Sequence, residues 1–75
     1  MTQVRQFTAL IEREEEMYVA LCPELDIASQ GSTIQEARGN LVEAIELFFE
    51  TASPDEIETR LPGEVYVTPI EVRVA

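Results

Sequence analysis

Residues 20–37, with the sequence ALCPELDIASQGSTIQEA, decide the fold of this chain. An apolar run ends at a proline, a second short run follows, and a glycine stands immediately before a helix start. The helix start is signalled twice, because Ser32 is followed three residues later by Gln35 and Thr33 by Glu36. A hydroxyl just before a helix accepts a hydrogen bond from the third backbone amide, and a Gln or Glu there returns the bond. The segment predicts a strand, a turn, a strand and a helix in immediate succession.

Three strands are expected before this helix. Alternating apolar positions and a high content of β-branched and aromatic residues predict strands over residues 4–13, 17–22 and 27–30. The polar residues 13–16 suit a hairpin loop between the first two strands. Pro23 ends the second strand because it has no N–H to donate to a neighbouring strand. The short links predict an antiparallel meander.

The hydrophobic period changes to that of a helix over residues 34–52. Apolar side chains recur every three or four positions there, which is typical of a helix that lies on a sheet. The opposite, solvent-facing side carries Glu36, Asn40, Glu43, Glu46 and Glu50. Two interpretations of this acidic stripe stay open: a solvated helix face, or an anionic surface that docks a cationic partner.

A short helix and a last strand are expected after the long helix. Ser53 is a good N-cap and Pro54 suits the first helical position, which predicts a helix from Pro54 to about Thr59. Residues 65–74 have the composition of a strand. The alternation changes phase at Pro69, and a proline with a phase change indicates an edge strand with a bulge.

The expected fold class is therefore α+β, with element order β-β-β-α-β and a short extra helix before the last strand. A right-handed crossover through the long helix places strand four beside strand one, giving the sheet order 3-2-1-4. One helix covers only one face of that sheet. We expect the other face to expose apolar side chains, either a set with Thr8, Leu10, Tyr18, Ala20 and Cys22 or the opposite set. Such a surface usually marks an interface, which predicts a homodimer or larger oligomer.

The composition limits the classes of partner. The chain has 75 residues, a formal net charge of −10, five arginines, no lysine and no histidine, which indicates a single domain with a strong negative field. Nucleic-acid binding rests largely on Lys and Arg that neutralise phosphates, so direct binding to DNA or RNA is not expected. A basic partner protein is attracted by such a field, although charge can also serve solubility alone. No apolar run is long enough for a membrane span.

Catalysis is not expected. The common nucleophilic and acid–base mechanisms place a His or Lys beside the reacting group, and both residue types are absent. No cofactor and no metal site is predicted, and the single cysteine is expected to be a small buried hydrophobe. A divergent metal-dependent nuclease is the weaker alternative, with Glu12, Glu24, Asp26 and Glu71 as candidate ligands. The turn with Glu24 and Asp26 is either structural or a partner contact.

The same turn and helix start resemble the signature of the HicB-like antitoxin family. The family has a Pro-acid-Leu turn between two strands, matched by Pro23-Glu24-Leu25, and a Gly-x-Thr-x-x-Glu-Ala helix start, matched over residues 31–37. The resemblance extends from about Phe7 to Glu50. It implies a partial, non-catalytic ribonuclease-H-like fold.

The resemblance also implies a function. Typical HicB antitoxins cover the active site of HicA, a small basic RNA-cleaving toxin, so the expectation is a cytoplasmic binding module of residues 1–75 without a DNA-binding domain. The expected partner-binding residues are the acids of the turn and the helix: Glu24, Asp26, Glu43, Glu46 and Glu50. The alternative is an orphan homo-oligomeric structural or adaptor domain without a toxin partner.

Overall fold

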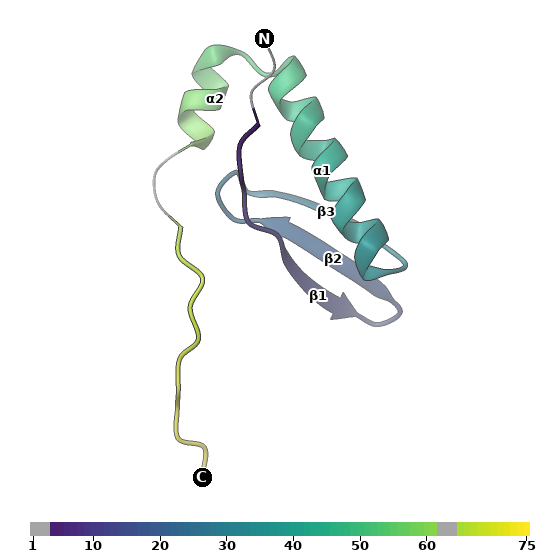
Figure 1. The fold of residues 1–75 in the computed structure, drawn as a ribbon, viewed down its shortest axis with the longest axis vertical. Helices are drawn as coiled ribbons and strands as arrows, with labels where there is room; N and C mark the ends of the chain where they lie inside the picture. The colour runs from purple at the N-terminus through teal and green to yellow at the C-terminus, as the bar shows by residue number, and fades with distance from the viewer. Residues whose placement is uncertain (1–3, 62–64) are drawn as a thin grey trace.

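The computed structural model describes residues 4–61 and 65–75, and its elements are three strands followed by two helices (Figure 1). They are β1 (Leu10–Glu14), β2 (Met17–Cys22), β3 (Ile27–Gly31), α1 (Ile34–Thr51) and α2 (Pro54–Arg60). The α+β class and both expected helices are confirmed. Strand β1 begins at Leu10, later than the expected start at Val4, and residues 4–9 form no strand.

The three strands form one antiparallel sheet in the order β1-β2-β3. The β1–β2 hairpin pairs Leu10 with Leu21 and Glu14 with Met17, and its turn places Glu15 at φ 55°. The β2–β3 turn likewise places Asp26 at φ 55°. Short polar side chains tolerate this left-handed conformation better than β-branched ones, so an Asp in the second turn is well suited to it.

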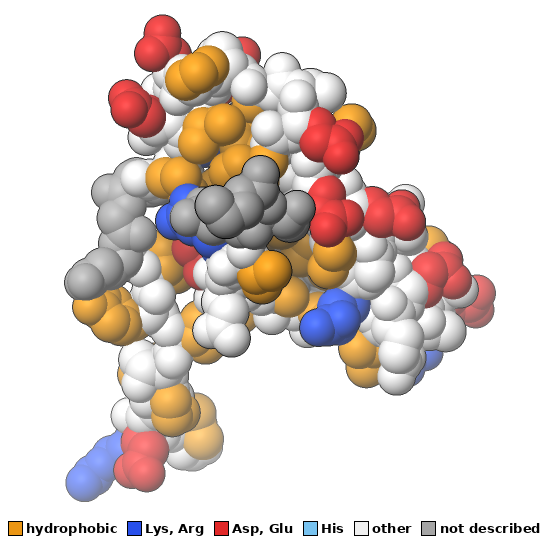
Figure 2. Space-filling view, turned by 45° about the horizontal axis from the view of Figure 1, so that its top comes forward, with side chains coloured by type: hydrophobic (Ala, Val, Ile, Leu, Met, Phe, Trp, Pro, Cys, Tyr) orange, Lys and Arg blue, Asp and Glu red, His pale blue; other side chains and the backbone are white. Residues whose placement is uncertain are grey.

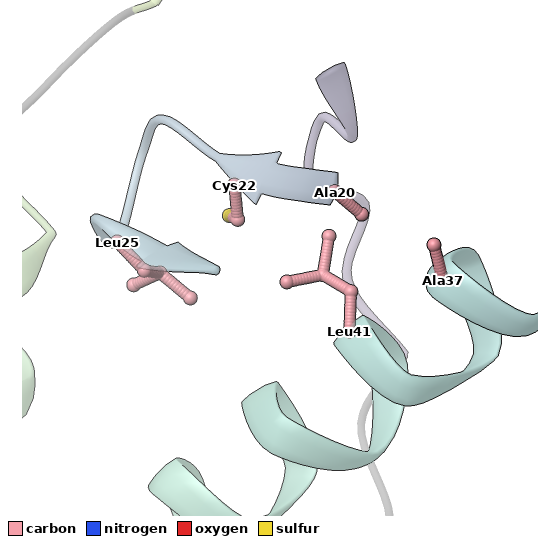
Figure 3. Packing of buried hydrophobic residues seen from close by; sticks show 5 residues of the cluster. All are labelled: Ala20, Cys22, Leu25, Ala37 and Leu41. Carbon is pink, nitrogen blue, oxygen red and sulfur yellow. The ribbon is translucent and has the colours of Figure 1, made fainter. Parts of the chain in front are cut away.

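Helix α1 covers one face of the sheet and packs most closely against β3 (Figure 1). The core lies between the helix and the sheet, where small side chains of β2 face the helix (Figure 3). Its fully buried members are Ala20, Cys22, Leu25, Ala37 and Leu41. Because Ala20 and Cys22 are small, the helix axis can lie close to the strand.

The N-terminus of α1 is built as the sequence predicts. The Glu36 amide donates to Thr33 Oγ1 at 3.0 Å, so Thr33 is the N-cap. The Glu36 carboxylate accepts from the Ser32 amide at 3.3 Å and from the Ser32 hydroxyl at 3.0 Å. Gly31 is needed just before this cap: a Cβ there would lie 2.6 Å from the backbone nitrogen of Ala37.

Helix α2 is held against the body of the fold by its last residue. Arg60 donates from Nη1 to the backbone oxygen of Leu25 at 2.8 Å, and its guanidinium lies 5.7 Å from the ring centre of Phe48. Phe49, beside Phe48, stacks on Phe7 at 5.8 Å between ring centres. These contacts fix the N-terminal segment and α2 at the same end of α1.

The prediction of a fourth strand over residues 65–74 is wrong. Residues 65–75 have no strand assignment and extend away from the sheet, so β1 keeps an open edge and the order 3-2-1-4 is not formed (Figure 1). Every residue of this segment is exposed. An alternating apolar pattern makes a strand only where a second backbone edge pairs with it, and this segment does not reach the edge of its own sheet.

Candidate interaction surface

Helix α1 carries three exposed acids on the side that faces away from the sheet. Glu43, Glu46 and Glu50 are exposed at spacings of three and four, opposite the side on which Leu41 packs into the core. Leu47 lies on the same helix face and is 58% exposed. We call these four residues, Glu43, Glu46, Leu47 and Glu50, the acidic face (Figure 2 shows the acidic side chains that follow α1).

The acidic face is not neutralised within the part of the chain that the structure describes. Among the described residues, Glu43, Glu46 and Glu50 make no hydrogen bond or ion pair, and the last turn of α1 has no basic residue. Like charges three or four residues apart destabilise a helix, and an acid near its C-terminus opposes the helix dipole. The arrangement therefore lowers the stability of α1, and the fold gains no contact in return.

Glu24 has a different role, because its carboxylate is used inside the fold. Its two oxygens accept from the Thr8 amide at 3.1 and 3.0 Å, and one also accepts from the Thr8 hydroxyl at 2.7 Å. Burial raises the pKa of Glu24, but the hydrogen bonds that the carboxylate accepts, first of all from the Thr8 hydroxyl and also from backbone amides and Cys22, outweigh burial and hold the pKa below its usual value. The carboxylate fastens the N-terminal segment to the β2–β3 turn, so the structure places Glu24 as an internal clamp.

The Cys22 thiol lies beside this clamp, with Sγ donating to a Glu24 oxygen at 3.5 Å. Burial is the main cause that raises the pKa of Cys22, which leaves the thiol protonated and unreactive near neutrality. This agrees with the expectation of a small buried hydrophobe. Asp26, next to the clamp, is exposed at the tip of the turn. Of the two turn acids, Asp26 alone is presented to solvent without a described partner.

The sheet face opposite α1 needs a correction to the expected interface residues. Ala20 and Cys22 are fully buried beneath α1, and Tyr18 packs against the same core, so these three do not lie on the open face. Thr8 is partly buried and bound to Glu24, while Leu10 is 36% exposed. Because the register pairs Leu10 with Leu21 and Ile11 with Ala20, neither expected set is right as a whole. The open face combines Leu10 of the first set with the β2 residues of the opposite set, Met17, Val19 and Leu21.

A sequence signal for this choice of face does exist. Ala20 and Cys22 are the small members of β2, and a helix approaches a sheet most closely over small side chains. The larger Met17, Val19 and Leu21 alternate with them and so belong to the other face. By contrast, the Thr8–Glu24 clamp joins residues 16 apart, and nothing local in the sequence indicates it.

The described residues contain no group of three or more acids, cysteines or histidines arranged to hold a metal ion, so the four carboxylates of the nuclease alternative are not gathered into one cluster. None of their helices has both the length and the apolar character that crossing a bilayer requires.

Comparison with known proteins gives the family. The chain is 37% identical over 68 residues to a UPF0150 protein of Helicobacter pylori strain J99, an alignment that covers 89% of this chain and 94% of the relative. This chain belongs to the UPF0150 family. Two further UPF0150 proteins, both from Synechocystis, are 45% identical over 51 residues (65% of each chain) and 44% identical over 61 residues (79% of this chain and 83% of the relative).

No family model and no solved structure matches the chain. The names of the UPF0150 relatives state the family and no activity. The function is therefore argued from the surfaces of this UPF0150 protein: an unneutralised acidic helix face, and an open apolar sheet face.

Proposed function

We propose that this UPF0150 protein is a non-catalytic binding module of the HicB antitoxin type, which neutralises a small basic RNA-cleaving toxin in the cytoplasm by protein–protein contact. The observation that carries the proposal is the acidic face of α1. Its three carboxylates lower the stability of the helix that presents them, and a cationic partner surface supplies the missing counter-charges. The net charge of −10 extends the same attraction to longer range.

The acidic face also offers an apolar anchor. Leu47 is 58% exposed between Glu43, Glu46 and Glu50. Interfaces commonly combine a desolvated apolar centre with a charged rim, where the centre supplies affinity and the rim supplies partner choice and association rate. A basic protein with an apolar depression between its cationic side chains fits this surface.

The test begins with a candidate toxin. A small Lys/Arg-rich protein encoded beside this chain in its genome is produced and purified. Cleavage of RNA by that protein is then measured with and without an equimolar amount of this chain. The proposal expects RNA cleavage to be suppressed at a one-to-one ratio. Full cleavage at that ratio, or purified chain that binds RNA itself at physiological salt, contradicts the proposal.

A charge reversal then locates the contact. The triple variant Glu43→Lys, Glu46→Lys, Glu50→Lys is expected to bind the toxin with an association rate at least about tenfold lower, because opposite charge steers encounter. The matched control reverses three exposed acids that lie outside α1 and β1: Glu15, Glu16 and Glu58. Both variants change the net charge equally, so a loss confined to the helix variant identifies the acidic face. Equal losses mean that the charge acts only through the overall field.

The salt dependence gives an independent readout. Charges on the exposed helix face are screened beyond about 8–10 Å near physiological ionic strength, so the association rate of the original chain falls as salt rises. For the helix variant, we expect the association rate to depend less steeply on salt.

The second candidate function is a homo-oligomeric adaptor without a toxin. It is favoured by a separate observation, the open apolar face of the sheet.

A further inference from the structure

The strongest unexplained feature of the molecule is its C-terminal segment, residues 65–75. The segment is extended and projects from the body, and the molecule measures 51 × 28 × 18 Å with it (Figure 1). Its large apolar side chains are exposed, among them Ile70 at 79%, Val72 at 71% and Val74 at 86%. These three β-branched residues alternate with Glu71 and Arg73, which is the pattern of a half-buried strand.

The sheet has one edge that matches this segment. Within residues 4–61 and 65–75, β1 pairs with β2 on one side only, so the backbone groups along its other edge, over Leu10–Glu14, have no strand partner among these residues. The edge of β3 is less open, because α1 lies closest to β3 and Asn40 of α1 donates to the backbone oxygen of Gln30 at 2.8 Å. An unpaired edge is a template for another strand.

We propose that residues 70–74 of one copy pair as a β-strand with the β1 edge of a second copy, in a reciprocal exchange. The chain supplies both halves of the interaction, an open five-residue edge and an unpaired five-residue strand pattern. A two-fold arrangement uses both tails and both edges and leaves neither unpaired, whereas a foreign strand would satisfy the edge and leave the tail exposed. The occupant of each β1 edge is therefore the tail of a second copy.

The side chains suit such a pairing. Helix α1 approaches β1 least of the three strands, so the helix-covered side of the sheet is covered least at β1, where we place the apolar residues of the tail beside Ile11. In this orientation Glu71 and Arg73 both lie on the open face, where β1 carries Glu12 and Glu14, so the favoured register sets Arg73 rather than Glu71 beside these acids. Opposite charges on neighbouring strands stabilise their pairing. The exchange also makes a four-stranded sheet in each half of the dimer.

The test compares the oligomeric state of the full chain with that of two proline variants. Val72→Pro removes an N–H from the centre of the exchanged strand, and Ala75→Pro places the same residue at the exposed chain end. Light scattering and sedimentation are expected to give a dimer for the original chain and for Ala75→Pro. Val72→Pro is expected to raise the dimer dissociation constant at least tenfold. Because Val72 is 71% exposed, its replacement leaves the folded monomer intact, which circular dichroism checks through the helix signal.

Hydrogen exchange supplies a second readout. In the original chain, the alternate amides of residues 70–74 that face β1 and the outward amides of β1 are expected to be protected, and the loss of dimer in the proline variant removes both protections together. A monomer at high micromolar concentration overturns the proposal. A dimer that survives both Val72→Pro and Glu71→Pro also overturns it and indicates stacking of the open sheet faces instead, because neighbouring N–H groups of a strand point to opposite sides and one of the two must face β1. The proposal is independent of the acidic face, since the triple helix variant described above is expected to remain dimeric.

Discussion

Replacement by alanine is expected to have opposite effects on stability at Gly31, just before α1, and at Gly39, inside α1. A Cβ at Gly31 lies 2.6 Å from the backbone nitrogen of Ala37, and 2.8 and 2.9 Å from the carbonyl carbon and Cβ of Glu36. A Cβ at Gly39 meets nothing within 4 Å. Gly31→Ala is therefore expected to destabilise the protein, whereas Gly39→Ala is expected to stabilise it.

The magnitudes follow from these contacts. The atoms that face Gly31 belong mainly to the α1 backbone, so relief requires the whole first turn of the helix to move from β3 by roughly 1 Å, an overpacking that costs about 2–3 kcal/mol. Gly39→Ala gains the helix propensity of alanine, about 0.5–1 kcal/mol. A chain of this size has a total stability of about 4–11 kcal/mol, so the first change removes a large part of it.

The assay is reversible unfolding by urea and by heat, followed by far-ultraviolet circular dichroism at one fixed protein concentration, because association couples to stability. With about 4–8 °C per kcal/mol for a domain of this size, Gly31→Ala is expected to lower the Tm by about 8–24 °C, and Gly39→Ala to raise it by about 2–8 °C. A Gly31→Ala protein as stable as the original refutes the close approach of β3 and α1 and the reasoning built on it.

Two smaller predictions test the helix cap and the clamp. Thr33→Ala removes the N-cap acceptor of α1 and is expected to cost about 1 kcal/mol in urea unfolding, while Thr33→Ser, which keeps the hydroxyl, is expected to cost much less. Because the folded-state pKa of Glu24 is lowered, its contribution to stability is full above the usual pKa of about 4.3 and is lost as the pH falls through the lower folded-state value. Glu24→Gln is expected to flatten the acid limb of the stability–pH curve, and an unchanged limb contradicts the clamp by Thr8.

The helices could be predicted from the sequence because their signals are local. The N-cap and its returning Glu36 lie within four residues of each other, and Ser53 with Pro54 marks the second start in the same way. Such short-range hydrogen bonds depend little on the rest of the fold. The β2 and β3 bounds were also close, because Pro23 and Gly31 limit what the backbone on each side can do.

The contacts that join distant segments could not be predicted in this way. Glu24 has the sequence context of an exposed turn acid, and its use as a clamp depends on Thr8 being brought beside it by the β1–β2 hairpin. Arg60 likewise meets the Leu25 carbonyl across 35 residues. In both cases the sequence indicates a polar residue in a loop or helix end, and only the fold determines its partner. The acidic face, by contrast, could be predicted from the sequence, since helical spacing alone places Glu43, Glu46 and Glu50 together.

The fourth strand shows where a sequence pattern stops being sufficient. The alternation of Ile70, Val72 and Val74 predicts a strand with one face packed against apolar side chains. The pattern does not distinguish between the sheet of the same chain and the sheet of another copy. Choosing between them needs the position of the segment itself: residues 65–75 have no strand assignment and extend away from the sheet (Figure 1). Pairing of the segment with the β1 edge would bury its exposed side chains and satisfy the unpaired backbone of β1. In the reciprocal exchange proposed above, a second copy does both at once for each chain.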